Sequence, residues 1–302
     1  MRPHQWVKNL LCVVPVVFTG NLTDPHMVMG ALLAMLAFNL ASGAVYIFND
    51  IRDCERDRQH PVKCRRPIAS GQLPMRTAIV FMSVFTLCAL GIAAFSNLAF
   101  LAVMAFYLLQ NVAYTSGLKR VVILDVMLVA NGFLLRAAGG AFAINVSASP
   151  WLVLCTLTLA LLVAFGKRRH EISLLGDAGA HRHTLVEYSA EFLDQSMSMA
   201  AAVAMVMYSL FTLSPYAVAN YGRSEALVLS VPMVLYAVFR FVFLVRQERM
   251  GGQPSKMFVT DKPLLINAIL WLAICIYAVY GPSDELPWWR IGIFDDPEAL
   301  RP

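Results

Sequence analysis

Long, continuous hydrophobic segments are separated by polar segments along the chain. Eight continuous apolar stretches are each long enough to cross a bilayer as a helix, which takes about 20 residues: 27–48, 77–95, 97–116, 121–144, 150–166, 196–219, 225–245 and 263–281. A ninth, shorter stretch runs from Trp6 to Gly20 and contains Pro15. Because the runs are continuous rather than alternating, membrane-spanning strands are excluded. The pattern predicts an all-α, polytopic membrane bundle of about nine transmembrane helices.

The composition supports the same class. Of the 302 residues, 59% are hydrophobic and only 14% are charged, whereas soluble domains carry roughly 25% charged residues. This scarcity of charge excludes a soluble globular enzyme, a disordered chain and a disulfide-rich secreted domain. The six cysteines form no CxxC pair and show no metal-ligand spacing with histidine, so no cysteine-based metal site is expected.

The basic residues are distributed unevenly between the two sides of the predicted bundle. Of the 24 Lys and Arg residues, 19 lie near the N-terminus or in the loops on the same side, 49–76, 117–120, 167–195 and 246–262. The positive-inside rule places these segments in the cytoplasm. The opposite connections are short and nearly uncharged, which favours an enzyme supplied from the cytoplasm over a transporter. We therefore expect a single domain, residues 1–302, with its active-site loops on the cytoplasmic side.

The first polar block opens with an aspartate-rich motif, Asn49-Asp50-Ile51-Arg52-Asp53-Cys54-Glu55-Arg56-Asp57. Asp50, Asp53 and Asp57 are spaced by three and four residues, so they share one face if the helix continues beyond the membrane. Oxygen ligands without His or Cys suit Mg²⁺, which commonly binds carboxylates together with substrate phosphate oxygens. Basic residues flank and follow the motif: Arg52, Arg56, Lys63, Arg65 and Arg66. The motif indicates a polyphosphate site; the alternative is a solvated helix end held by Asp–Arg pairs.

The pattern NDxxDxxxD at residues 49–57 resembles the first aspartate-rich motif of the UbiA superfamily of intramembrane prenyltransferases. The similarity extends over nearly the whole chain, with about nine spans and large cytoplasmic loops after the second, sixth and eighth. Three further segments resemble one branch, the decaprenyl-phosphate phosphoribosyltransferases: residues 2–9, 60–68 and 261–264. The aspartate motif is specific for the superfamily, and the opening RPHQWVKN segment indicates the branch.

The resemblance implies Mg²⁺-dependent transfer of 5-phosphoribose from 5-phosphoribosyl 1-diphosphate to a polyprenyl (decaprenyl) phosphate, with release of diphosphate. It implies that Asp50, Asp53 and Asp57 hold the metal and that Asn49 orients the site. Phosphate contacts are expected from basic residues of the cytoplasmic side: Lys8, Arg56, Lys63, Arg66, Lys119, Lys167 and Arg169. It further implies a homo-oligomer in the bacterial cytoplasmic membrane, with the N-terminus in the cytoplasm and no nucleic-acid partner.

The chain departs from typical superfamily members in the loop 167–195. Those members hold a prenyl diphosphate between two aspartate-rich motifs, but this loop contains no DxxxD, and Asp177 and Asp194 are too far apart to form one. It begins instead with a basic run that includes Lys167 and Arg169, which suits direct binding of phosphate anions. The alternative is contact with lipid headgroups under the positive-inside rule. His170, His181 and His183 are expected to be solvated loop residues.

Two further pairs are candidates for substrate contact. Tyr114 and Lys119 are interfacial anchors by position, but the pair also resembles an element of the branch whose lysine would contact phosphate. Asp125 and Arg136 lie within one span and are close to three helical turns apart, so they share a face and could partner through Asn131. Ionised residues inside a membrane are candidates for a functional site, and we expect both to line a cavity. The alternative is that Asp125 sits near the cytoplasmic boundary and Arg136 ties helices together.

Two other functions remain open from the sequence. A true prenyltransferase would join a prenyl diphosphate to an aromatic or other small acceptor, and it would need the missing second aspartate-rich motif. A flippase or transporter of anionic lipids is less favoured, because the loops on the outer side are short and nearly uncharged.

Overall fold

The computed structural model describes residues 3–59, 63–173, 187–221, 223–247, 257 and 260–281. The described residues form helices and no strands, which confirms the predicted all-α class. Their long helices are α2 (Pro25–Arg52), α4 (Met75–Ser96), α5 (Leu98–Ser116), α6 (Leu124–Ala143), α7 (Pro150–Ser173), α9 (Ala190–Thr212), α12 (Val231–Arg246) and α14 (Lys262–Tyr280). Short elements join them: η1 (Pro3–Cys12), α1 (Val14–Phe18), α3 (Cys54–Arg58), η2 (Lys63–Arg65), η3 (Leu118–Arg120), α10 (Pro215–Asn220) and α11 (Ser224–Val228).

Eight helices of the described chain are long and apolar enough to cross a membrane, one of them being α11 and α12 taken together. They match the eight long stretches predicted from the sequence. The ninth stretch is different, because it forms the 3-10 helix η1 followed by the short helix α1. A 3-10 helix rises about 2.0 Å per residue, so these two elements together extend about 28 Å. That length is close to the roughly 30 Å of a hydrocarbon core, although the segment has too few residues for an ordinary spanning helix.

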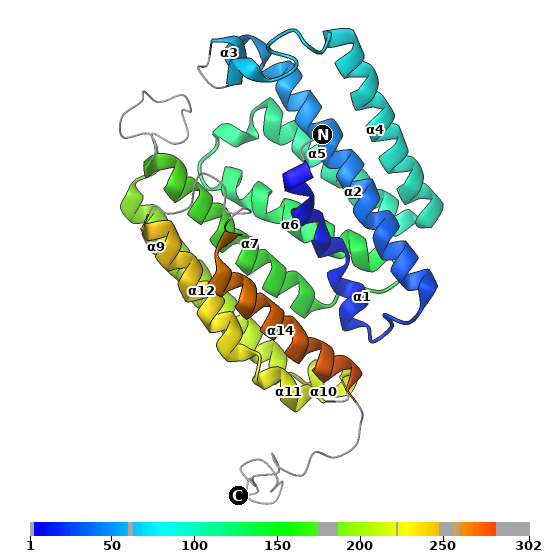
Figure 1. Ribbon diagram of the computed structural model, residues 1–302, viewed down its shortest axis with the longest axis vertical. Coiled ribbons are helices and arrows are strands. Elements are labelled where there is room, and N and C mark those ends of the chain that lie inside the picture. Colours follow the sequence, from blue (N-terminus) through cyan, green and yellow to red (C-terminus); the bar gives the residue numbers. More distant parts are fainter. Residues whose placement is uncertain are drawn as a thin grey trace, which may run out of the picture.

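Figure 1 shows the helices as one bundle, with α2 and α4 on one flank, α9, α12 and α14 on the other, and α6 and α7 between them. The N-terminal segment η1–α1 packs against α2 and α6. The hydroxyl of Tyr280 on α14 donates to the carbonyl oxygen of Val17 at 2.9 Å. This contact links the last described helix to the first segment. We call the end that carries α3 the α3 end, and the end that carries α10 the α10 end.

Polar residues start several of these helices. Asp24, Asn97, Ser189 and Asp261 are N-caps whose side chains accept a backbone N–H of the first turn of α2, α5, α9 and α14. Such a cap satisfies one of the donors that a helix start leaves without a partner. Proline follows the cap of α2 and stands in the first turn of α14, where its missing N–H costs nothing.

Both ends of the segment 167–195, which was expected to be a loop, are helical. Helix α7 continues to Ser173 and α9 already begins at Ala190, so Lys167 and Arg169 lie on a helix. The expectation of a solvated loop was wrong for His170, whose side chain is buried on α7 without a hydrogen-bond partner in the described structure. His181 and His183 lie outside the described residues.

Small residues allow the central helices to approach closely. The buried face of α2 carries Ala31, Ala34, Ala37 and Ala41, and α6 carries Gly139 and Gly140, which face Phe38 and Cys12. Close backbone approach at small residues is a common mode of packing between membrane helices. On the outside, large apolar side chains such as Phe95 and Leu98 are exposed, as expected for surfaces in contact with lipid. The chain is therefore a multi-pass membrane protein.

Replacement of Gly140 by alanine should destabilise the protein. A Cβ atom there would collide with the backbone carbonyl of Cys12, so η1 must shift, and overpacking of this kind costs about 1–3 kcal/mol. We expect a lower melting temperature of Gly140→Ala in detergent. The matched control is Gly91→Ala on α4, where a Cβ meets nothing within 4 Å and where alanine favours the helix. Equal melting temperatures of the two variants would contradict this packing.

Candidate active site

The aspartate-rich motif lies where α2 passes into α3. The helix geometry is interrupted at Asp53, yet the amide of Asp53 donates to the carbonyl of Asn49 at 2.9 Å. The amide of Asp57 in turn donates to the carbonyl of Asp53 at 2.8 Å. Because helical hydrogen bonds continue across the break, Asp50 and Asp57 remain on one face, as the spacing predicted.

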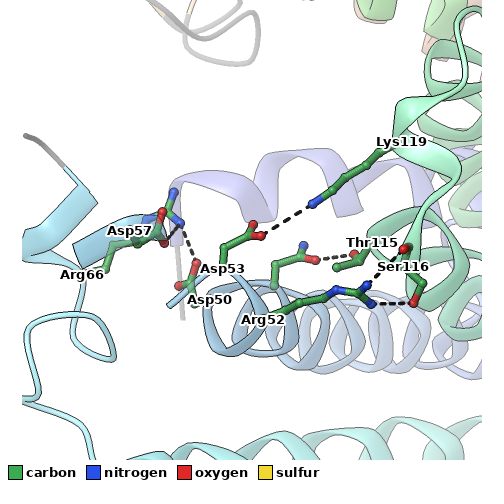
Figure 2. A network of polar contacts seen from close by, with 9 residues as sticks. Asp50, Arg52, Asp53, Asp57, Arg66, Thr115, Ser116 and Lys119 are labelled. Carbon is green, nitrogen blue, oxygen red and sulfur yellow. Dashed lines mark hydrogen bonds and ion pairs between the residues drawn. The ribbon is translucent and has the colours of Figure 1, made fainter. Parts of the chain in front are cut away.

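One guanidinium nitrogen lies between two of the carboxylates. Nη1 of Arg66 is 2.6 Å from Oδ2 of Asp57 and 3.0 Å from Oδ1 of Asp50 (Figure 2). Asp57 is buried, whereas Asp50 and Arg66 are partly exposed. Arg66 follows α3 in the chain, so this pairing folds the segment after η2 back onto the motif. Two acidic side chains therefore converge on one positive charge.

The end of α5 and the adjoining η3 hold the other side of the motif. Nζ of Lys119 lies 3.7 Å from Oδ1 of Asp53 (Figure 2). Arg52 donates to the hydroxyl of Ser116 at 2.8 Å and to its carbonyl at 3.0 Å, and the hydroxyl of Thr115 donates to the side-chain oxygen of Asn49. Asn49 thus anchors the motif to α5, and Lys119 reaches the acidic face, a proximity that the sequence could not reveal.

The donor set fits a hard divalent cation. Asp50 and Asp57 already place two oxygens within 3.0 Å of one positively charged nitrogen, and Asp53 is on the same motif. The described residues contain no group of three or more His, Cys, Asp or Glu side chains already arranged for a metal. An ion here would need Arg66 to move and substrate oxygens to complete its ligands, which agrees with the preference of Mg²⁺ for few protein carboxylates.

Two of the other expected phosphate contacts lie on the surface of the same end. Arg56 on α3 and Lys63 on η2 are both exposed. Arg56 stands next to the buried Asp57 in the sequence, so its side chain leaves the helix on another face. Their position leaves both side chains accessible to a soluble ligand.

A buried network joins α5, α6 and α7 near the same end. Nε of Arg168 donates to Asp125 at 2.7 Å, and its other nitrogens donate to Glu171 at 2.5 Å and to the hydroxyl of Tyr114 at 3.1 Å. The hydroxyl of Tyr188 donates to Asp125 at 2.7 Å. Burial, together with this bond, raises the pKa of Tyr188 above its ordinary value, so the phenol keeps the proton that it donates.

The sequence reasoning missed the roles of Arg168, Glu171 and Tyr188. The three-residue spacing of Arg168 and Glu171 on a helix was the available signal. The expected link between Asp125 and Arg136 through Asn131 was wrong, because Asn131 donates to Gln110 instead. Asp125 pairs with Arg168 of α7, and the side-chain partners of Arg136 lie on η1, α2 and α5, since facing elements offer closer groups than a position three turns away.

Arg136 is buried and has neutral partners. Its guanidinium donates to Asn9 at 2.6 Å, to the carbonyl of Gly132 at 2.5 Å, to Ser42 at 3.2 Å and to Tyr107 at 2.9 Å. It also lies 4.9 Å from the centre of the Tyr107 ring, a cation–π distance. These bonds connect η1, α2, α5 and α6, so Arg136 ties helices together, as the alternative interpretation held.

The remaining basic candidates are on α7. Arg169 pairs with Asp194 of α9 at 3.1 Å. Lys167 lies 3.8 Å from Glu171 and is half-buried. Arg169 is therefore engaged with α9, whereas Lys167 stays near the Arg168 network.

An apolar cavity of about 340 Å³ lies inside the bundle. It extends from the middle of α6 and α7 toward the α10 end, and its walls include Leu11, Phe18, Phe133, Leu159, Val163 and Trp271. Arg136 and Asp125 are not part of this wall, so their expected cavity-lining role stays a prediction. The cavity offers room for part of a hydrocarbon chain.

The described chain thus combines a polar, carboxylate-bearing α3 end with an apolar cavity. Residues 10–261 match the model of the UbiA prenyltransferase family, and the chain belongs to this family of membrane enzymes.

Similar proteins extend the comparison over most of the chain. A decaprenyl-phosphate phosphoribosyltransferase of Corynebacterium glutamicum is 31% identical over 93% of this chain and 85% of its own. One of Mycolicibacterium smegmatis is 30% identical over 93% of this chain and 91% of its own. Among solved structures, a UbiA homologue of Archaeoglobus fulgidus bound to GPP and Mg²⁺ superposes with a TM-score of 0.69, at 18% identity, over 92% of this chain and 97% of its own.

Loss of Arg168 should destabilise the bundle strongly. Arg168→Met leaves Asp125 buried without its guanidinium, which costs about 3–5 kcal/mol. We expect a large fall in melting temperature in detergent, and partial recovery in the double variant Asp125→Leu with Arg168→Met, which removes the stranded charge.

The matched control is Arg58→Met. Arg58 pairs with Glu55 at 2.8 Å, but both side chains are exposed, so the loss is only about 0–1 kcal/mol. A double variant no more stable than Arg168→Met would contradict the assigned role of the buried pair.

Proposed function

We propose that the protein transfers 5-phosphoribose from 5-phosphoribosyl 1-diphosphate to a polyprenyl phosphate and releases diphosphate. The observation that carries the proposal is the charge pattern of the α3 end. One aspartate-rich motif is present, whereas the facing end of α7 carries Lys167, Arg168 and Arg169. A site with one carboxylate cluster and one basic cluster suits two phosphorylated substrates. The names of the curated relatives support the same reaction.

Asp50, Asp53 and Asp57 would hold Mg²⁺ on the diphosphate of the donor. When bound, this ion would act as a Lewis acid that stabilises the departing diphosphate. Arg66 and Lys119 already lie against these carboxylates. Once the diphosphate is bound, both cations are placed to transfer their hydrogen bonds to its oxygens and to stabilise the charge that develops there.

The reaction needs little proton transfer. An oxygen of the lipid phosphate supplies the electron pair for the new bond to C1 of the ribose. The bond between C1 and the diphosphate oxygen breaks, and its electrons leave with diphosphate. Attack from the face opposite the leaving group gives inversion at C1. The chain's contribution is to orient the two substrates and to keep water away from C1.

We also place the α3 end in the cytoplasm of a bacterial cell. The Lys and Arg residues concentrate at this end, as the positive-inside rule requires, and Arg223 is the basic residue near the α10 end in the described chain. A soluble, polyanionic donor would then reach the aspartate motif without crossing the membrane.

Neutralising one carboxylate of the motif should abolish the transfer. In purified membranes with labelled 5-phosphoribosyl 1-diphosphate and polyprenyl phosphate, we expect Asp50→Asn and Asp53→Asn to lose at least 100-fold in rate, as does excess EDTA. The cause is that the neutral amide keeps only one weaker oxygen ligand and loses the negative charge that attracts the metal and the nearby Lys119 and Arg66.

The matched control is Glu55→Gln, since Glu55 lies in the same motif but its side chain is exposed and points elsewhere. Its rate should stay within about twofold of wild type. Full activity of Asp50→Asn, or of the enzyme in EDTA, would refute the metal assignment. A product formed from a prenyl diphosphate and an aromatic acid, with none from 5-phosphoribosyl 1-diphosphate, would instead identify a prenyltransferase.

A further inference from the structure

Two lysines, which are not themselves part of the cavity wall, each lie about one helical turn from a residue that is. Lys8 is three residues before Leu11 in η1, and Lys167 is four residues after Val163 in α7; Leu11 and Val163 both line the cavity. Residues three apart eclipse in a 3-10 helix, and residues four apart share a face in an α-helix. Each lysine therefore stands above an apolar wall residue, on the side of the α3 end.

The contacts of Lys8 place it at the same mouth. Its Nζ lies 5.9 Å from the ring centre of Phe133, and Phe133 is itself part of the cavity wall. Cζ of Arg136 lies 5.9 Å from the centre of the same ring. Cations of η1 and α6 therefore lie against one residue of the cavity wall, and helical spacing from Val163 places Lys167 of α7 toward the same end.

The nearby carboxylates do not balance these cations. Asp125 binds Arg168, and Glu171 is shared between Arg168 at 2.5 Å and Lys167 at 3.8 Å. Within the described ranges, neither Lys8 nor Arg136 has a carboxylate at ion-pair distance. Half-buried charge without a counter-ion is costly in a membrane protein, so this mouth is suited to an anionic group.

This basic mouth is separate from the aspartate motif. Ser42, which accepts from Arg136, and Asp50 are both on α2 and are about 12 Å apart along the helix axis. The motif with Arg66 and Lys119 thus lies nearer the α3 end, and the two lysines lie deeper, against the apolar cavity. A ribose between them could face a phosphate on each side.

We infer that Lys8 and Lys167 hold the phosphate of the acceptor lipid, a polyprenyl monophosphate whose chain enters the apolar cavity. The inference rests on the proposed function and assigns the basic residues to two substrates. Arg66 and Lys119 bind the diphosphate of the donor, and Lys8 and Lys167 bind the phosphate of the lipid. The same phosphate-monoester chemistry occurs in the 5-phosphate of the donor. The continuity of the lysines with the apolar wall assigns the mouth to the lipid.

Binding without the donor tests the assignment directly. Farnesyl phosphate and farnesol are titrated against the purified full chain in detergent, with tryptophan fluorescence as readout, since Trp151 and Trp271 line the cavity. We expect Lys8→Gln and Lys167→Gln each to weaken binding of farnesyl phosphate about tenfold, with binding of farnesol unchanged. Lys8→Arg, which keeps the charge, should retain most of the affinity and shows that the segment folds.

The matched control is Arg76→Gln, an exposed position on the first turn of α4 that removes the same charge from the α3 end. Its affinity for farnesyl phosphate should equal that of wild type. Unchanged affinity of both lysine variants for farnesyl phosphate would overturn the assignment.

Kinetics separate the two sources of phosphate. In the lysine variants the KM for polyprenyl phosphate should rise about tenfold, while the KM for 5-phosphoribosyl 1-diphosphate stays within twofold. A rise in the KM for the donor alone would overturn the inference and assign the lysines to its 5-phosphate. The protein could bind farnesyl phosphate through the two lysines and yet show no phosphoribosyl transfer. That result would refute the proposed reaction but would support the lipid-phosphate site.

Discussion

Arg168 and Asp125 form an ion pair inside the bundle, where both side chains are almost completely removed from solvent. In such surroundings an unpaired charge is very costly, so the pair requires α6 and α7 to keep one relative position. Tyr188 and Tyr114 complete the hydrogen bonds of the two groups and fix the start of α9 and the end of α5 to the same point. The basic end of α7 is thereby held facing the segment that carries Lys119.

Close packing of small residues has a complementary effect on the N-terminal segment. Gly140 lets the backbone of η1 lie directly against α6, and the bond from Arg136 to Asn9 fixes the rotation of η1. Lys8, next to Asn9, is then directed to the mouth of the apolar cavity. A segment too short to look like an ordinary spanning helix thus supplies one wall of the cavity and one of its charges.

The proposed function requires the UbiA scaffold to accept two phosphorylated substrates, and the charge pattern offers a physical basis for this. The aspartate motif keeps the chemistry of a polyphosphate site, because three carboxylates on one face attract a cation whatever the rest of the substrate is. Opposite the aspartate motif, the end of α7 carries basic residues instead of a second acidic motif. This side of the site therefore attracts an anionic group rather than a metal ion. Lys167 and its neighbours favour an anion that arrives without its own metal. Under the proposed function, the apolar cavity would favour a phosphate attached to a long hydrocarbon chain.

The sequence by itself determined the membrane class, the eight long helices, the aspartate face and the family, because hydrophobic length and helical spacing are local properties. The family and the all-α fold are confirmed, whereas the catalytic and binding roles of individual residues remain predictions. Only the tertiary structure decided which charges meet: Arg66 with Asp50 and Asp57, Lys119 with Asp53, and Arg168 rather than Arg136 with Asp125. These pairs join residues on different helices or across turns, and desolvation selects them only after the helices have packed, so no local pattern could reveal them.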